Sequence, residues 1–170
     1  HVLDDLEGLV DCVIDGGASD YGIESTVVHC SDCHTRILRH GAITREMITA
    51  ELGITIADDS GGVDDAGGRP RAPGQEASHY APLTPVCPNC RSGGKTALWL
   101  GFGPEDYGAD LNLSDQGDLD EAARNLFGML RESDRQAIEA DLERICVSPI
   151  PVTGIGVAIN DRLRRAASRD

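Results

Sequence analysis

The pattern of hydrophobic and polar positions predicts strands and helices on both sides of one long polar stretch. In the first part, short apolar or alternating runs bounded by turn residues predict strands at residues 10–14, within 22–30 and within 35–41. A helix should follow them, because Thr44 can cap its start and Gly53 can end it.

The apolar signal disappears in the middle of the chain, in the sequence ADDSGGVDDAGGRPRAPG at residues 57–74. Glycine, proline and acidic residues dominate there, so we interpret this stretch and the residues up to Pro85 as an exposed linker. The chain should therefore divide into a strand-rich part at residues 1–56, a linker at 57–93 and a second domain at 94–170.

The pattern after the linker predicts strand, helix, strand and helix. The strands are expected at residues 96–103 and 144–151, and the last helix at 156–168, with Arg164 and Arg165 near its negative end. The longer helix should start at the cap Asp118, because apolar residues recur every three or four positions from Leu119 to Leu130. This order indicates a small parallel α/β unit.

Composition narrows the classes of function. The chain has 170 residues and a formal net charge of −14, and Lys95 is its only lysine. Nucleic-acid affinity comes largely from neutralised phosphates, so we expect no direct nucleic-acid binding by this segment. An acidic surface suits a basic protein partner instead. No apolar run is long enough for a membrane span and no signal-peptide pattern opens the chain, so the expected location is the cytoplasm.

Six cysteines raise the question of metal or redox chemistry. Cys30 with Cys33, and Cys87 with Cys90, form two Cys-x-x-Cys pairs, the set that a structural zinc site uses. The pairs are far apart in sequence and neither has the strand-before, helix-after setting of a thioredoxin-like site. Incidental thiols are the simpler interpretation, with a zinc-stabilised interaction domain as the alternative. We expect Cys12 and Cys146 to be ordinary core residues.

Ser25, Thr26 and Arg39 are the candidates for a binding site in the strand-rich part. They lie at or near strand ends, where binding groups often sit, and arginine binds phosphate through a planar pair of donors. Taken singly, Ser25 and Thr26 are better explained as polar positions of a half-buried strand, and Arg39 as a solvent-exposed arginine at a strand end.

Taken in series, the sequence motifs resemble one family. "IESTVV", "ILRHGAIT", "APGQEASHYAP" and "AINDRLRRAA" occur in the order and spacing of the threonylcarbamoyl-AMP synthase family, in its long two-domain form. The resemblance implies part of a YrdC-type mixed sheet, a linker, and a small Rossmann-like three-layer α/β domain. It implies formation of threonylcarbamoyl-AMP and pyrophosphate from L-threonine, bicarbonate and ATP with Mg²⁺. The product would feed the threonylcarbamoyladenosine modification of tRNA, alongside other tRNA threonylcarbamoylation proteins.

The resemblance also assigns roles to individual residues. Ser25 falls on the serine that contacts threonine, and Thr26 is its neighbour. Arg39 falls on the arginine that contacts ATP phosphates. Tyr80, with His79 beside it, falls on the linker motif that folds over the nucleotide. A structural tyrosine that pins the linker, and a histidine that only packs, are the alternatives for this pair.

The family's motifs from the first half of the catalytic domain are not found in this chain. We therefore interpret the sequence as the C-terminal part of a longer enzyme and expect it to be inactive alone. The alternative is a non-catalytic binding or regulatory module whose second domain docks on a partner.

Overall fold

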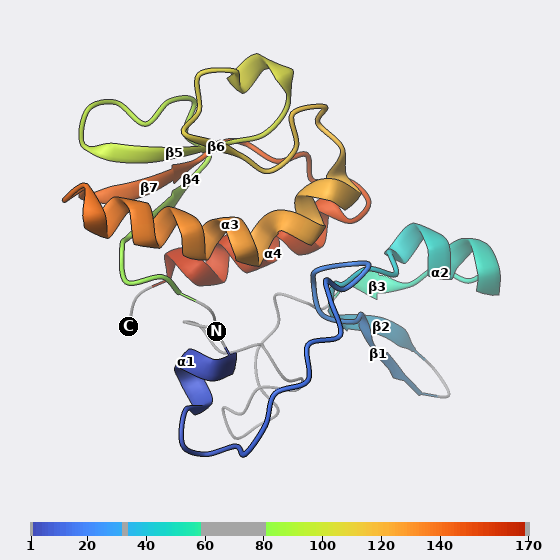
Figure 1. Cartoon of the computed structure of the whole chain (residues 1–170). Coiled ribbons are helices and arrows are strands. Elements are labelled where there is room, and N and C mark those ends of the chain that lie inside the picture. Colours follow the sequence, from blue (N-terminus) through green and yellow to red (C-terminus); the bar gives the residue numbers. More distant parts are fainter. Residues whose placement is uncertain (1, 32–33, 59–80, 169–170) are drawn as a thin grey trace.

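The computed structural model describes residues 2–31, 34–58 and 81–168 (Figure 1). The strands of the described residues form two sheets, of three and four strands. We call residues 2–58 the N-terminal unit and residues 81–168 the C-terminal unit. Residues 59–80, which lie between them in sequence, are outside the described ranges.

The N-terminal unit is built on the sheet β1-β2-β3, in which β2 pairs antiparallel with β1 and parallel with β3. Its elements are α1 (Val2–Leu6), β1 (Val27–Cys30), β2 (Thr35–Arg39), α2 (Arg45–Leu52) and β3 (Ala57–Asp58). The predicted caps of α2 are confirmed, because the Thr44 side chain accepts a hydrogen bond from the Met47 amide and Gly53 has φ 64°. The strand predicted within residues 35–41 is also confirmed.

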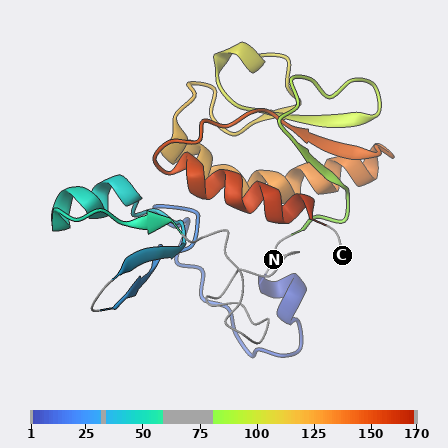
Figure 2. The same ribbon diagram turned by 180° about the vertical axis from the view of Figure 1, so that it is seen from behind.

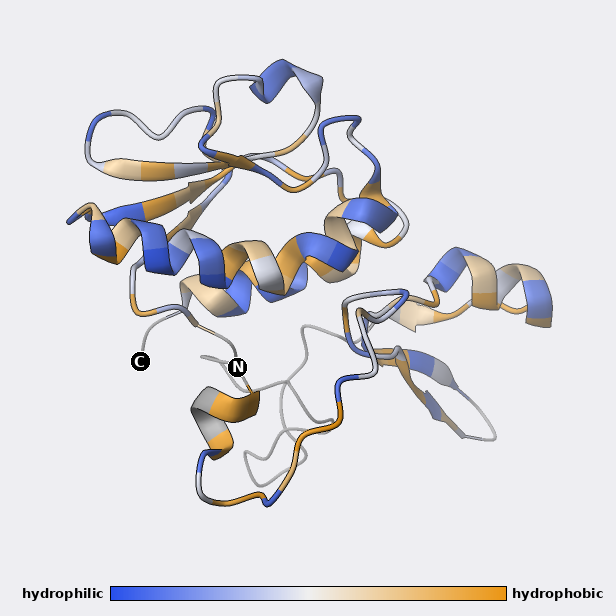
Figure 3. Cartoon of the chain, in the orientation of Figure 1, coloured by the Kyte–Doolittle hydropathy of each residue, from blue (hydrophilic) through white to orange (hydrophobic). Residues whose placement is uncertain are grey.

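The strand predicted at residues 10–14 is wrong. Those residues have no regular structure, and Ile14 is 90% exposed. Figure 3 shows this apolar segment as an open coil after α1. A strand needs a neighbour to pair its backbone groups, and none lies beside it in the described residues. Cys12, expected in the core, is exposed for the same reason. The strand expected within residues 22–30 is present only at Val27–Cys30.

The C-terminal unit has a parallel sheet in the order β4-β7-β5-β6, and this confirms the predicted α/β class. Its elements are β4 (Val86–Pro88), β5 (Ala97–Gly101), the 3₁₀ helix η1 (Pro104–Asp106), β6 (Leu111–Asn112), α3 (Leu119–Glu139), β7 (Arg144–Val147) and α4 (Gly156–Ala167). As predicted, Asp118 caps α3 by accepting a hydrogen bond from the Glu121 amide at 2.7 Å.

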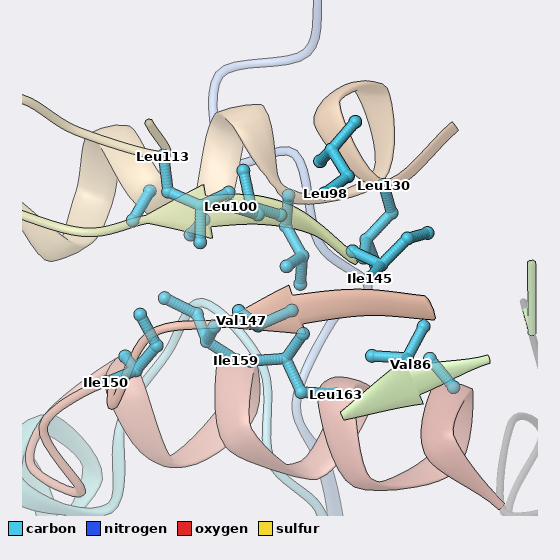
Figure 4. Packing of buried hydrophobic residues seen from close by; sticks show 14 of the residues in the cluster. Val86, Leu98, Leu100, Leu113, Leu130, Ile145, Val147, Ile150, Ile159 and Leu163 are labelled. Atoms are coloured by element: carbon cyan, nitrogen blue, oxygen red, sulfur yellow. The ribbon is translucent and has the colours of Figure 1, made fainter. Parts of the chain in front are cut away.

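Helices α3 and α4 lie side by side on one face of this sheet, as the two opposite views agree (Figures 1 and 2). The core forms between them and the strands (Figure 4), where Leu100, Leu126 and Ile145 are fully buried. The connections at 89–96 and 102–110 cover the opposite face, where Gly93 and Gly108 approach the Trp99 side chain. Within the described residues, no helix combines the length and the apolar character needed to cross a membrane.

Two short strands, β3 and β4, fall inside the linker predicted at residues 57–93. The chain re-enters the described structure against α3, whose Asp134 carboxylate accepts hydrogen bonds from the backbone amides of Leu83 (3.0 Å) and Thr84 (2.7 Å). One helical carboxylate thus fixes the start of the C-terminal unit, just before β4.

Candidate functional site

Arg39 and Ser25 meet at the edge of the N-terminal sheet. Arg39 is the last residue of β2, and its Nε and Nη2 atoms donate to the Ser25 carbonyl oxygen at 3.1 and 3.0 Å. Nη2 also lies 3.3 Å from the Ser25 hydroxyl oxygen. Because Arg39 is only 9% exposed, its planar donors are held in one place and fix the backbone and the side chain of Ser25 together.

A glycine two residues further on makes this approach sterically possible. A Cβ atom at Gly41 would lie 2.3 Å from the Glu24 carbonyl oxygen and 2.4 Å from the Thr26 amide nitrogen. Both are backbone atoms and cannot turn away. The glycine of the LRHG sequence therefore allows residues 24–26 to lie against the end of β2. Thr26 completes the contact by donating its hydroxyl hydrogen to the Ile43 carbonyl oxygen.

A mainly apolar pocket of about 410 Å³ opens beside this contact. Three of its lining residues carry hydroxyl groups, namely Tyr21, Ser25 and Thr26. The remaining lining residues are Ile23, Val28, Ala42, Ile43 and Ile48. The pocket can therefore hold a small molecule that has both an apolar part and hydrogen-bonding groups.

Glu24, the residue before Ser25, is bound by the C-terminal unit. Its carboxylate accepts a hydrogen bond from Arg162 Nε at 2.8 Å, and the Arg162 side chain is 2% exposed. Arg162 also pairs with Asp161, which in turn pairs with Arg165 on α4. Burial raises the pKa of Glu24, but the charge and hydrogen bond of Arg162 outweigh it, so the pKa lies below its ordinary value of 4.5.

The residues just before Glu24 also contact the C-terminal unit closely. A Cβ atom at Gly22 would lie 2.3 Å from the Arg124 Cα atom of α3, and Gly22 has φ 67°. Its neighbour Ile23 packs against the core cluster of the C-terminal unit. Residues 22–26, which we call the bridging segment, thus contact α3 and α4 on one side and the end of β2 on the other.

Comparison with known proteins identifies the family of the chain. A family profile described as "Threonylcarbamoyl-AMP synthase, C-terminal domain" matches residues 43–168. The chain belongs to the threonylcarbamoyl-AMP synthase family. This membership is what the sequence motifs implied, and it covers the C-terminal unit and the end of the N-terminal unit.

Individual relatives and solved structures support the assignment along nearly the whole chain. The chain is 32% identical to threonylcarbamoyl-AMP synthase of Bacillus subtilis, and the match covers 98% of the chain and 51% of the relative. It is 31% identical to the Pyrococcus abyssi enzyme, covering 52% of it. The crystal structure of P. abyssi Sua5 complexed with L-threonine matches with a TM-score of 0.76 at 31% identity, covering 98% and 52% of the two chains. The chain spans about half the length of these curated relatives.

The structure brings some of the predicted site residues together. Ser25, Thr26 and Arg39 lie in one cluster beside the pocket, although each taken singly was better explained as an ordinary polar strand residue. His79 and Tyr80 lie outside the described residues.

The two cysteine pairs belong to different units. Cys30 is exposed at the end of β1, whereas Cys87 and Cys90 are half-buried at β4, and Cys33 lies outside the described residues. No group of three or more histidine, cysteine or acidic side chains within the described ranges has a geometry that would hold a metal ion.

The sequence analysis missed two contributors to the site. Arg162 is separated from Glu24 by 138 positions, and a buried arginine in a helix rich in arginine gives no local signal. Gly41 could have been noticed, since a glycine directly after a strand suggests close approach of another backbone segment.

We expect Gly41→Ala to destabilise the N-terminal unit by about 1–3 kcal/mol, because the new methyl group overlaps the backbone of the bridging segment. The measurement is hydrogen exchange of the β2 amides, which should become faster. Gly128→Ala is the matched control. Gly128 lies inside α3, and a Cβ atom there would have no other part of the chain within 4 Å. The substitution should therefore be neutral or stabilise the protein by up to about 1 kcal/mol. Unchanged exchange in β2 after Gly41→Ala would show that this close approach is not required.

We expect Glu24→Gln to lower the free energy of unfolding by about 1–3 kcal/mol at pH 7, since it removes one of the two carboxylates that pair with the buried Arg162. The folded-state pKa of Glu24 is depressed, so the ion pair stabilises the protein above pH 4.5, the ordinary carboxyl value. The stabilisation is lost as the pH falls through the folded-state pKa. The difference in the free energy of unfolding between the wild type and Glu24→Gln should therefore become smaller at acidic pH.

Urea unfolding of both proteins at several pH values measures this difference. Glu51→Gln, a change at an exposed position of α2, is the control and should show little difference at any pH. A difference in the free energy of unfolding that stays constant across the acidic range would contradict the role given to the Glu24 charge.

Proposed function

We propose that this chain is the C-terminal part of a threonylcarbamoyl-AMP synthase. The whole enzyme would form threonylcarbamoyl-AMP and pyrophosphate from L-threonine, bicarbonate and ATP, for the threonylcarbamoyladenosine modification of tRNA. Its place would be the cytoplasm, where ATP and tRNA are available. The observation that carries the proposal is the Arg39–Ser25 contact beside a small pocket, in a chain that belongs to this family.

The pocket suits threonine as the substrate. Threonine has a methyl group that matches the apolar lining, and hydroxyl, amino and carboxyl groups that can hydrogen-bond with Ser25 and Thr26. Arg39 holds the Ser25 hydroxyl at a fixed position, so the substrate would meet a preorganised donor. The solved P. abyssi Sua5 complexed with L-threonine supports the same substrate class.

The reaction joins the substrate to a nucleotide. The amino group of threonine and bicarbonate would give a carbamate, whose oxygen attacks the α-phosphate of ATP. The new P–O bond forms as the bond to the β-phosphate oxygen breaks, and pyrophosphate leaves. The chain's own residues would contribute by orienting the carbamate at Ser25 and by lining the pocket with apolar side chains that exclude water.

Arg39 has two candidate tasks in this scheme. Its Nε and Nη2 atoms are already bound to Ser25, so positioning Ser25 is the task that its contacts support directly. A contact to ATP phosphates rests on the family resemblance and on the affinity of guanidinium groups for phosphate.

The adjacent histidine and tyrosine of the linker are the proposed nucleotide-side residues. His79 and Tyr80 form the one His-Tyr pair in this sequence. A solved variant of P. abyssi Sua5, 27% identical with a TM-score of 0.71, has an adjacent histidine and tyrosine replaced by alanine. We propose that Tyr80 contacts the bound nucleotide and that His79 assists or packs beside it.

The pocket residues do not fit a magnesium site. Magnesium prefers an octahedral set of oxygen ligands that commonly includes carboxylates, and none of the described residues that line the pocket is acidic. The nearest carboxylate along the chain, Glu24, is bound to Arg162. We therefore assign no step to the metal within this chain, and its ligands would be the ATP phosphates and groups outside it.

Kinetics of the full-length protein containing this chain test these roles. Ser25→Ala should raise KM for threonine about tenfold and leave KM for ATP unchanged, because it removes one hydrogen-bonding group. Arg39→Ala should raise both constants, and ATP binding should weaken by about 1.5–3 kcal/mol through loss of a charge-assisted contact. The assay measures pyrophosphate release at varied concentrations of each substrate.

Arg45→Ala is the control, because Arg45 is an exposed arginine at the start of α2, with a side chain that is 43% exposed. Its constants should equal those of the wild type. An Arg39→Ala enzyme with only the threonine constant changed would restrict Arg39 to positioning Ser25. If Ser25→Ala and Arg39→Ala both had the wild-type KM values for threonine and ATP, the assignment of these residues to the substrate site would be refuted.

A further inference from the structure

Three cysteines lie together in the C-terminal unit, away from the proposed substrate site. Cys87 on β4 and Cys146 on β7 are direct partners in the parallel ladder, so their side chains share one face of the sheet. The neighbours of Cys146, Ile145 and Val147, belong to the core under α3 and α4. Because side chains alternate along a strand, Cys146 points to the opposite face, which the loops cover (Figure 1).

The turn after β4 brings the third cysteine back to the same place. Asn89 adopts φ 63°, which reverses the chain, and the Cys90 amide then donates to the Val147 carbonyl oxygen at 2.9 Å. The Cys90 thiol lies 3.2 Å from the Cys87 carbonyl oxygen. The Cys-x-x-Cys sequence therefore wraps around the end of β7 and places Cys90 next to Cys146.

The three thiols differ in their access to solvent. Cys146 is 6% exposed, whereas Cys87 and Cys90 are half-buried. Burial, followed by hydrogen bonding with the Cys90 thiol, raises the pKa of Cys146 to about 11. Cys146 is therefore protonated at neutral pH, and a reagent from solution would react first with one of the other two thiols.

We propose that Cys90 and Cys146 form a reversible disulfide, which makes this cluster a site of oxidation. A Cα separation of about 4.4–6.8 Å permits a disulfide. The Cys90 and Cys146 thiols hydrogen-bond with each other, and the Cys90 amide is hydrogen-bonded to the residue that follows Cys146, so the two sulfur atoms already lie in contact. Cys87 is the neighbouring thiol that remains reduced.

The oxidant is a small-molecule disulfide of the glutathione class. The Cys90 thiolate attacks one of its sulfur atoms, a mixed disulfide forms, and one small thiolate leaves. Cys146 gives its proton to solvent and attacks the Cys90 sulfur, which releases the second small thiolate. Two protein thiols are thereby oxidised, one external disulfide is reduced to two thiols, and an added thiol reverses both steps.

The bond would fix the end of β4 to β7. The loop that starts at Cys90 runs over Trp99, where a Cβ atom at Gly93 would be 2.9 Å from the Trp99 Cβ atom. Trp99 is the only tryptophan of the chain and is the ladder partner of Cys146 on β5. Its fluorescence should therefore decrease when a disulfide, an efficient quencher, forms beside it.

Peptide mapping tests the proposal on a chain in which Cys12, Cys30 and Cys33 are serine, so that only the three clustered thiols remain. The protein is treated with glutathione disulfide and digested with trypsin without reduction. We expect residues 72–91 and 145–162 to appear as one linked species, with fragmentation placing the bond at Cys90. Trp99 emission should fall on oxidation and recover with dithiothreitol.

Single variants decide which thiol takes part. Cys87→Ser should keep the link and the fluorescence change, whereas Cys90→Ser should lose both. Cys90→Ala is made in parallel, and unoxidised emission spectra confirm that each variant is folded. A bond between Cys87 and Cys90, a link that requires Cys87, or mixed disulfides with glutathione and no link would each overturn the proposal.

Discussion

The structure depends on how the bridging segment, residues 22–26, is held between two folding units. On one side Glu24 pairs with Arg162 of α4, which is nearly inaccessible to solvent and also pairs with Asp161. Asp161 also pairs with two other arginines, so loss of Glu24 would leave the buried Arg162 with incomplete neutralisation, and the ion pair ties the position of Glu24 to the fold of α4. Gly22 and Ile23 add steric and apolar contacts with the same unit.

The position of Ser25 follows from this arrangement. Glu24 is bound by the C-terminal unit, and the next residue, Ser25, lies against the end of β2. There Arg39 holds its carbonyl and hydroxyl oxygens, and Gly41 leaves room for the backbone. A helix near the C-terminus thus helps to position a proposed substrate-binding residue near the start of the chain. The C-terminal unit thus contributes to the position of Ser25, although none of its described side chains lines the pocket.

Local chemistry allowed much of the fold to be predicted. The caps Thr44, Gly53 and Asp118 depend only on nearby residues, and all three were correctly identified. The predictions that were wrong or missing concern features that depend on a partner far away in the sequence. The apolar run at residues 10–14 has strand-like composition but no neighbouring strand in the described residues. Likewise, Arg162 and the Cys87–Cys146 register depend on contacts between remote segments. The cluster of Ser25 and Arg39 was anticipated through the family resemblance, since each residue alone carried little information.

A double-mutant cycle between Glu24→Gln and Arg162→Met tests the central claim most directly. The free energy of urea unfolding is measured for the wild type, both single variants and the double variant through the fluorescence of Trp99, which lies in the C-terminal sheet. If the bridging segment and α4 stabilise each other through this ion pair, the two changes should be non-additive by about 1 kcal/mol or more. Additivity within about 0.3–0.5 kcal/mol would contradict the account.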